Sequence, residues 1–295
     1  MSYLDTKLIK IGVYYDGNYF AHASDYYRYV HQLKSRISIQ GLHDYIIHKV
    51  AEVEETKERY CHVVDSHYFR GRYNADDTRA HNKLYSERQF DDILIGSGVT
   101  THYLPMTKYG EKGVDVWFAL EAYEGALLKK YDVIVLIAGD RDYVPLARKL
   151  NALGTRIMLL GWNFEYEDVD GQLHTTYTSK SLVSEVTYPI LMDLEIDEAL
   201  RTGERDVSGI FVRPQNRRSQ TPSSSSVQSG SICNIQGYYG FITPDTGGEN
   251  IFFHFKSLQD EDEVTRLELD ACVTYEIGEY NGKTVAVNVA LNCTA

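Results

Sequence analysis

Short apolar runs rich in β-branched and aromatic residues alternate with segments of helical spacing over the first two hundred residues. The strand-like runs are residues 10–16, 60–69, 99–105, 131–140 and 156–161, most of them bounded by turn residues. Between them, residues 114–130 and 143–154 carry apolar positions at helical spacing. We expect Val114, Phe118 and Leu120–Ala122 to form one buried face, and Gly154 to cap the second helix. This alternation predicts an α/β domain with a mostly parallel sheet covered by helices on both faces.

The pattern changes near residue 229, where short apolar runs follow one another with only turns between them. The runs are ICNI, GFIT, NIFFHF, CVTYEI and VAVNVA, which together predict a small antiparallel barrel. Before them, residues 209–230 are rich in Ser, Pro, Gln and Arg. Such a composition favours a flexible linker, although a long surface loop within one domain is the alternative. We therefore expect an α/β domain over residues 1–204, a linker over 205–228 and an all-β barrel over 229–295.

The composition is that of a soluble globular protein, with 43% hydrophobic and 24% charged residues. No apolar run approaches the ~20 residues needed to span a bilayer, and the N-terminus lacks a signal pattern. The four cysteines are far apart and form no CxxC pair, which favours reduced thiols and a cytoplasmic location. The net charge of −12 argues against purely electrostatic binding of nucleic acid.

Four aspartates occupy the positions where parallel strands end or where the next helix begins. Asp16 ends the first strand, Asp140 ends the strand of residues 131–140, Asp142 starts the following helix, and Asp115 lies in the first turn of another. Each of them alone could be a helix cap or a turn residue. Together at one sheet edge, four carboxylates would repel one another unless a cation neutralises them. Hard oxygen ligands suit Mg²⁺ or Mn²⁺, which can activate water for attack on a phosphate.

Three segments of the chain together resemble the NYN branch of the PIN-like nucleases. They are VYYDGNYF, KGVDVWFALEAY and the run from Tyr131 to Gly161, in matching order and spacing. The resemblance implies a metal-dependent ribonuclease with a parallel sheet between helical layers, which leaves a 5′ phosphate on its product. It also implies that Asp16, Asp115, Asp140 and Asp142 bind the metal. Asn18 would orient a ligand or water, and Lys112 would contact a phosphate.

The sequence departs from this family pattern near its expected last helix. Members often carry a further aspartate there, whereas Thr187 occupies that position in TSKSLVSEVTYPILMDL. Glu185 and Asp193 are the acidic residues that could substitute for it.

Basic residues follow the strand ends and are candidates for contact with the RNA backbone. Arg70 and Arg72 come after the second strand, Lys108 precedes the acidic helix, and Arg141 lies between two aspartates. Arginine suits bidentate phosphate contacts. The equally acceptable alternative for each residue is a solvated surface charge.

The segment NIQGYYGFITPDTGGENIFFHFKSL resembles a cold-shock domain, an OB-type barrel. Its YGFI and IFFHF runs match the two nucleic-acid motifs and nominate Tyr239, Phe241, Phe252 and His254 as base-stacking residues, with Tyr238 and Phe255 less secure. The first strand lacks the usual Trp, and Gln236 replaces an expected Lys. Residues 229–295 carry three Lys or Arg against ten Asp or Glu. A barrel that binds protein, or nothing, is therefore the alternative to one that binds single-stranded RNA.

The leading hypothesis is a ribonuclease that uses Mg²⁺ or Mn²⁺, with a barrel that captures single-stranded RNA. The first alternative is an RNA-binding regulator that keeps the fold but cleaves poorly. A phosphatase or nucleotide hydrolase is the other, disfavoured by the lack of a DxD pattern at Asp16-Gly17-Asn18. The expected partner is RNA and not a membrane, and a homo-oligomer is left open.

Overall fold

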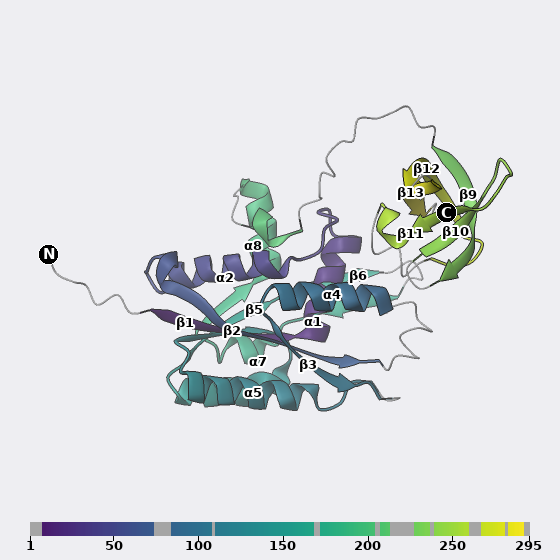
Figure 1. Ribbon diagram of the computed structural model, residues 1–295. Helices are drawn as coiled ribbons and strands as arrows, with labels where there is room; N and C mark the ends of the chain where they lie inside the picture. The colour runs from purple at the N-terminus through teal and green to yellow at the C-terminus, as the bar shows by residue number, and fades with distance from the viewer. Residues whose placement is uncertain are drawn as a thin grey trace. The chain divides into compact units, whose positions relative to one another are not determined.

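The computed structural model describes residues 8–73, 84–107, 110–167, 172–203, 207–212, 227–236, 239–259, 267–280 and 283–291. The chain forms two compact units, one built on an open sheet and the other on a closed barrel (Figure 1). Lys108 and Tyr238, both considered in the sequence analysis, lie outside the described residues. Within those residues, no helix combines the length and apolar character needed to cross a membrane.

The first unit contains a six-stranded parallel sheet in the order β3-β2-β1-β4-β5-β8. Its strands are β1 (Ile9–Asp16), β2 (Cys61–Arg72), β3 (Thr100–Pro105), β4 (Val133–Ile137), β5 (Arg156–Gly161) and β8 (Tyr188–Leu191). The all-parallel arrangement and five of the six strands agree with the sequence prediction. Every residue of β4 is buried, as expected for a central strand covered on both faces.

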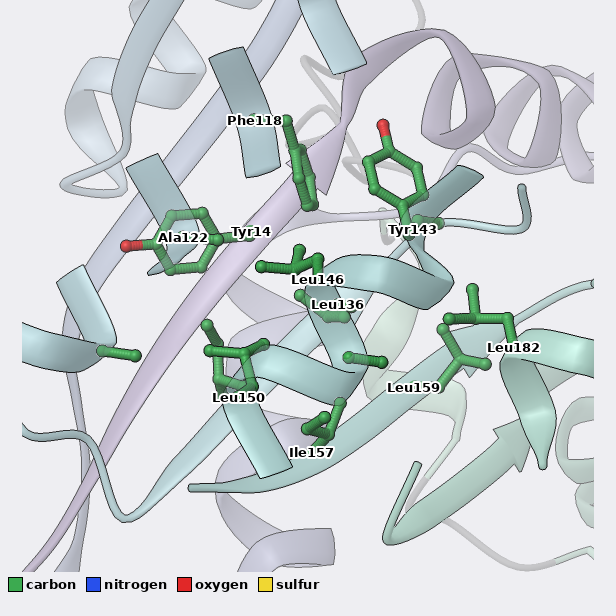
Figure 2. Close-up of a cluster of buried hydrophobic side chains, with 14 of the residues drawn as sticks. Tyr14, Phe118, Ala122, Leu136, Tyr143, Leu146, Leu150, Ile157, Leu159 and Leu182 are labelled. Atoms are coloured by element: carbon green, nitrogen blue, oxygen red, sulfur yellow. The ribbon is translucent and has the colours of Figure 1, made fainter. Parts of the chain in front are cut away.

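Helices cover both faces of this sheet (Figure 1). One face carries α5 (Val114–Lys129) and α6 (Val144–Ala152), whose apolar residues pack with Tyr14, Leu136 and Leu159 in the cluster drawn in Figure 2. The prediction for the first of these helices is confirmed for Val114, Phe118 and Ala122, but Leu120 is 64% exposed. The buried stripe of α5 is narrower than expected because it follows the spacing of four residues from Val114 to Ala122.

The opposite face is covered by α1 (Gly17–Asp25), a π-helical turn (Tyr26–Val30) and α2 (Ile39–Val53). Tyr15 on β1 contacts Phe20 of α1 and His43 of α2, so alternate residues of one strand serve the two cores. The other helical elements are η2 (Glu58–Tyr60), α4 (Leu84–Gly96), η3 (Arg141–Tyr143), α7 (Lys180–Val183), α8 (Met192–Thr202) and η4 (Ser208–Ile210). All of them belong to this unit except the first part of α4, since residues 84–91 group with the second unit.

Two features of the first unit were not predicted. A small antiparallel hairpin, β6 (Phe164–Glu167) with β7 (Leu173–Thr176), follows β5. Residues 207–212, which fall in the expected linker, pack onto this unit: Ile210 is fully buried, and Phe211 pairs with Ile37. The described part of the first unit therefore extends to Val212, and residues 213–226 lie outside the described residues.

The second unit is a closed five-stranded barrel in the order β10-β11-β13-β12-β9. Its elements are β9 (Gln228–Gln236), β10 (Tyr239–Pro244), β11 (Ile251–His254), η5 (Phe255–Ser257), β12 (Cys272–Tyr280) and β13 (Lys283–Leu291). Ile232, Ile242, Phe253 and Tyr275 form part of its buried core. The predicted barrel is confirmed, but it is not antiparallel throughout, because β11 pairs with β13 in parallel.

Candidate functional site

The carboxyl ends of β1 and β4 form the switch point of the sheet. From β1 the chain adds β2 and β3 on one side, and then returns to place β4 and β5 on the other. Connections that leave two neighbouring strands in opposite directions open a crevice at their carboxyl ends. Asp16 is the last residue of β1, and Asp140 follows β4 after Ala138 and Gly139. The topology therefore brings these two aspartates to the same crevice from positions far apart in sequence.

Tyr143 links Asp16 to Asp115. The hydroxyl oxygen of Tyr143 lies 3.0 Å from Oδ2 of Asp16 and 3.1 Å from Oδ1 of Asp115. Oδ1 of Asp16 also accepts the backbone N–H of Tyr19 and so caps α1. Since one hydroxyl carries one proton, Tyr143 can donate to only one carboxylate at a time. A cation or a second proton would reduce the remaining repulsion between the two carboxylates.

The pKa of the Asp16 carboxyl is raised by its burial and by neighbouring negative charges. Burial raises the pKa of its carboxyl to about 6, and the nearby charges of Asp115 and Glu111 add to that shift. The hydrogen bonds from Tyr19 and Tyr143 act in the opposite direction without cancelling it. Glu111 itself accepts the backbone N–H of Gly71 at the end of β2. Perturbed carboxyl groups of this kind mark candidate functional sites.

An open cavity of about 250 Å³ lies at this edge. Its walls come from the ends of β1 and β4, the start of α1 and the β6–β7 hairpin, through Asp16, Asn18, Tyr19, His22, Gly139, Asp140, Thr175, Thr176 and Tyr177. Gly139 is required here, because a Cβ atom on it would lie 2.4 Å from the ring of Tyr19. Two predicted residues, Asn18 and Asp140, thus share a cavity with Asp16. Sequence reasoning missed Tyr19, His22 and the hairpin.

The 3-10 turn η3 (Arg141–Tyr143) leads into α6, and Asp140 precedes it as the N-cap. Asp140, Arg141 and Asp142 are all exposed. Oδ1 of Asp140 accepts the backbone N–H of Asp142 at 2.9 Å, so Asp140 also caps this turn. Asp142 does not belong to the cavity wall. The four predicted aspartates therefore divide into a pair linked through Tyr143, Asp16 and Asp115, and two residues at one turn. Of the four, only Asp16 is partly buried, and the other three are exposed.

The four aspartates offer only carboxylate oxygens, which are the ligands that Mg²⁺ and Mn²⁺ prefer. Across the described parts of the chain, only His67, His102 and Glu121 form a group of three with ligand atoms within 4.8 Å of one another. The four aspartates are more widely spaced than that. Mg²⁺ keeps several waters and commonly uses one or two carboxylates together with substrate phosphates, which suits an open group of aspartates. Asp16, with its raised pKa, and Asp140 on the same cavity are the best placed of the four.

The residues considered for the missing acidic position lie at different edges of the sheet. Thr187 pairs with Ile157 at the amino ends of β5 and β8, and its hydroxyl oxygen accepts the N–H of Ile157. Glu185 pairs with Arg148 at 2.7 Å. Asp193 instead lies in the first turn of α8, just after the carboxyl end of β8. Burial raises the pKa of Tyr19, and the charge of Asp193 adds to that shift. Of the three, Asp193 is the one close to the cavity wall.

The predicted phosphate-binding residues flank the same edge. Arg70 and Arg72 lie on the last residues of β2, and the guanidinium of Arg72 stacks over the ring of Tyr103 at 4.7 Å. Lys112 is exposed in the segment before α5, and Arg141 separates the two exposed aspartates. Basic side chains thus lie beside three of the connections that form the edge.

The barrel carries three aromatic rings in mutual contact on one face. Phe241 of β10 is opposite Phe252 of β11, and both rings contact Tyr239 at centroid distances of 5.4–6.0 Å. All three are partly exposed, whereas Phe253, which alternates with Phe252, is buried. His254 is opposite Tyr239 in the register and partly exposed. Phe255 is buried and belongs to the core, so it is not part of this aromatic face.

Comparison with known families follows the division into two units. Residues 10–193 match the NYN domain, and residues 228–292 match the 'Cold-shock' DNA-binding domain. The chain belongs to the NYN domain family and carries a cold-shock domain after it, which confirms both resemblances found in the sequence. A NYN domain, of the PIN-like nuclease group, joined to a cold-shock domain supports a nucleic-acid-binding nuclease.

Individual relatives are remote. None of the curated proteins matches the chain. Among solved structures, a protein of unknown function from Vibrio parahaemolyticus is 21% identical, with 65% of this chain and 97% of that chain covered and a TM-score of 0.41. The Drosophila Unr CSD456 structure is 12% identical, with 44% of this chain and 39% of that chain covered and a TM-score of 0.21.

Proposed function

We propose that the protein is a ribonuclease that hydrolyses phosphodiester bonds with Mg²⁺ or Mn²⁺ at the carboxyl edge of the sheet. The single observation that carries this proposal is the contact of the Tyr143 hydroxyl with both Asp16 and Asp115, next to the cavity that Asp140 shares. Two carboxylates on one hydroxyl, one of them desolvated, are unfavourable without a cation. The arrangement is understandable as a site that binds one.

The residues of this edge divide the work between them. Asp16, Asp115, Asp140 and Asp142 would hold the metal, which when bound supplies an activated water and offsets the charge that develops on the phosphate. Asn18 would orient the water or the phosphate from the cavity wall. Lys112, Arg141, Arg70 and Arg72 would hold neighbouring phosphates of the strand. Tyr143 would keep Asp16 and Asp115 at a fixed separation.

The barrel would capture single-stranded RNA through Tyr239, Phe241, Phe252 and His254. Partly exposed rings on adjacent strands present their faces to bases, and such stacking tolerates different base identities. This mode of binding needs little net positive charge, which suits a chain with a net charge of −12. A second RNA site on the same chain raises the local concentration of substrate without tight binding at either site.

Cleavage of an end-labelled single-stranded RNA tests this proposal. We expect wild-type protein to cut the RNA with Mn²⁺ or Mg²⁺ and not with EDTA, leaving 5′ phosphates on the products. Asp140→Asn should lose this cleavage, whereas Asp92→Asn on the exposed side of α4 should retain it.

The second candidate is an RNA-binding regulator without cleavage. It is favoured by the wide spacing of the four aspartates and by the position of Thr187 at the opposite edge. Retention of intact RNA by both the wild type and Asp140→Asn, with no metal-dependent rise in melting temperature, would support the regulator.

A further inference from the structure

A second group of ligating side chains lies apart from the aspartates, between the sheet and α5. His67 belongs to β2, His102 to β3 and Glu121 to α5. One ligand atom from each lies within 4.8 Å of the other two. Nδ1 of His67 and Nε2 of His102 face each other at 2.8 Å. His67 is almost completely buried, whereas His102 and Glu121 are partly exposed and leave a route for an ion.

We propose that His67, His102 and Glu121 bind a transition-metal ion of the zinc class. Two imidazole nitrogens and one carboxylate are a common three-ligand set for zinc, with water in the fourth position. Imidazole ligands suit Zn²⁺, Co²⁺ or Ni²⁺ and are a poor match for Mg²⁺, which requires oxygen donors. The histidine cluster would thus prefer zinc-class ions, whereas the proposed aspartate site would prefer Mg²⁺ or Mn²⁺.

Asp65 contacts the ring nitrogen of His67 that does not face His102, and so orients the His67 ring. Its Oδ2 lies 2.9 Å from Nε2 of His67 and also contacts Lys129 and Tyr131, which fix its position. A carboxylate beside Nε2 favours the tautomer that carries the proton there, so the lone pair of Nδ1 points at His102. Metal-binding histidines commonly have such a carboxylate on the second ring nitrogen.

Metal binding requires only a small rearrangement of the two rings. With the proton of His67 on Nε2, the hydrogen bond between the two rings requires His102 to donate from its own Nε2. To bind a metal ion through Nε2, His102 must carry this proton on its Nδ1 instead. The proton moves within His102, so this residue releases no net proton. Two nitrogens on a tetrahedral zinc are about 3.3 Å apart, given Zn–N bonds of about 2.0–2.1 Å. The rings would therefore separate slightly while remaining stacked on Tyr14 and Phe69.

The proposed ion would fasten α5 to the two edge-side strands of the sheet. The same helix carries Asp115 in its first turn, and β2 carries Arg70 and Arg72 beyond His67. An ion bound to residues of β2, β3 and α5 would link these three elements and restrict the motion of the helix. We therefore expect the amides of α5 to exchange their hydrogens more slowly when the ion is bound.

Zinc binding to the full chain tests the proposal without any assay of activity. After treatment with chelator and dialysis against Zn²⁺, elemental analysis should find one tightly held zinc per wild-type chain, and Co²⁺ should give the visible absorption of a four-coordinate site. His102→Gln and Glu121→Gln should each weaken binding by about 100-fold or more, and Asp65→Asn by about 10–100-fold. Excess Mg²⁺ should not displace the zinc.

Matched controls lie on the same elements. His62→Gln on β2 and Glu124→Gln on α5 change exposed residues outside the cluster and should keep wild-type binding. Asp140→Asn should keep it as well, which separates this site from the proposed nuclease site. Circular dichroism of each metal-free variant verifies that it is folded. Absence of stoichiometric zinc in the wild type, or wild-type affinity in folded His102→Gln and Glu121→Gln, would overturn the proposal.

Discussion

The hydroxyl of Tyr143 donates to Oδ2 of Asp16 at 3.0 Å, although 127 residues separate them in the chain. Tyr143 is otherwise a core residue, with its ring packed against Phe118 and its hydroxyl directed away from the apolar cluster (Figure 2). Burial and the charges of Asp16 and Asp115 raise the pKa of this hydroxyl, so it remains a proton donor. A single side chain thus connects the hydrophobic core to the carboxyl edge.

Tyr143→Phe should impair the proposed cleavage while preserving the fold. The ring remains in the core, but Asp16 and Asp115 lose their common donor. A hydrogen bond to a charged group contributes about 1.5–3 kcal/mol, so the rate should fall by about 10–150-fold. The measurement is single-turnover cleavage of labelled RNA at saturating Mn²⁺. Tyr188→Phe is the matched control, because it removes a hydroxyl that donates to Glu54.

Asp16→Asn should stabilise the metal-free protein at neutral pH. The folded-state pKa of Asp16 is raised from 3.8 to about 6, so the charged carboxylate destabilises the fold as pH rises through that interval. Removing the charge should raise the melting temperature in EDTA at pH 7.5 by a few degrees, since about 1 kcal/mol corresponds to roughly 2–4 °C in a domain of this size.

The difference in melting temperature between Asp16→Asn and the wild type should change with added metal and with acid. Added Mn²⁺ should stabilise the wild type more than Asp16→Asn, because the variant lacks a ligand. At pH 4, where the wild-type carboxyl is largely protonated, the two metal-free proteins should melt at nearly the same temperature. If the variant is less stable than the wild type in EDTA at pH 7.5, the contribution of Asp16 as the cap of α1 outweighs the cost of its buried charge, and the prediction is wrong.

Phe241→Ala and Phe252→Ala should weaken binding of single-stranded RNA. Loss of one stacked base corresponds to about 1–3 kcal/mol, or roughly 5–150-fold in Kd. Fluorescence anisotropy with a labelled oligonucleotide, in the absence of divalent metal, measures the change. Both rings are partly exposed, so the barrel should still fold, whereas Phe253→Ala opens a cavity in its core and should unfold it. Unchanged affinity in both surface variants would favour a barrel that does not bind RNA.

Asp65 should stabilise the fold except in strong acid. Burial opposes ionisation of its carboxyl, but hydrogen bonds from Lys129, Tyr131 and His67 outweigh it and lower the pKa to about 2. Its contribution is therefore complete above about pH 4 and is lost as the pH falls toward 2. Asp65→Asn should unfold at lower urea concentration than the wild type at pH 7, and the difference should shrink between pH 4 and pH 2.

The parallel sheet and the placement of Asp16 and Asp140 could be predicted from the sequence alone. Both rest on local signals, namely a buried apolar strand that ends in a turn and a carboxylate. The rule that carboxyl ends of parallel strands share one edge then brings the two aspartates together without knowledge of any contact.

The other parts of the site depend on contacts between residues that are distant in sequence. Tyr143 looks like the first residue of an amphipathic helix, and nothing nearby indicates that its hydroxyl reaches Asp16. The β6–β7 hairpin is short, and the run of Leu173–Thr176 has only one apolar residue, which gives a weak strand signal. The family pattern predicts Thr187 at the position of a further acidic residue, whereas its hydroxyl oxygen accepts the backbone N–H of Ile157 in β5.

No sequence pattern predicts the cluster of His67, His102 and Glu121 either. Its members come from two strands and a helix with no recognisable spacing, and only the parallel register of β2 and β3 brings the histidines together. Similarly, helical periodicity predicts α5, but it also places Leu120 on the buried face, and Leu120 is exposed. The parallel contact of β11 with β13 follows from closure of the barrel, which local turn signals do not encode.

A double-mutant cycle in RNA cleavage tests the central claim most directly, namely that Asp16 and Asp140 form one metal-dependent centre. The rates to compare are those of the wild type, Asp16→Asn, Asp140→Asn and the double variant with Mn²⁺. We expect each single variant to lose nearly all cleavage and the double variant to lose little more, because residues that act as a unit are strongly non-additive. Absence of metal-dependent cleavage in the wild type, or independent multiplicative losses, would contradict the account.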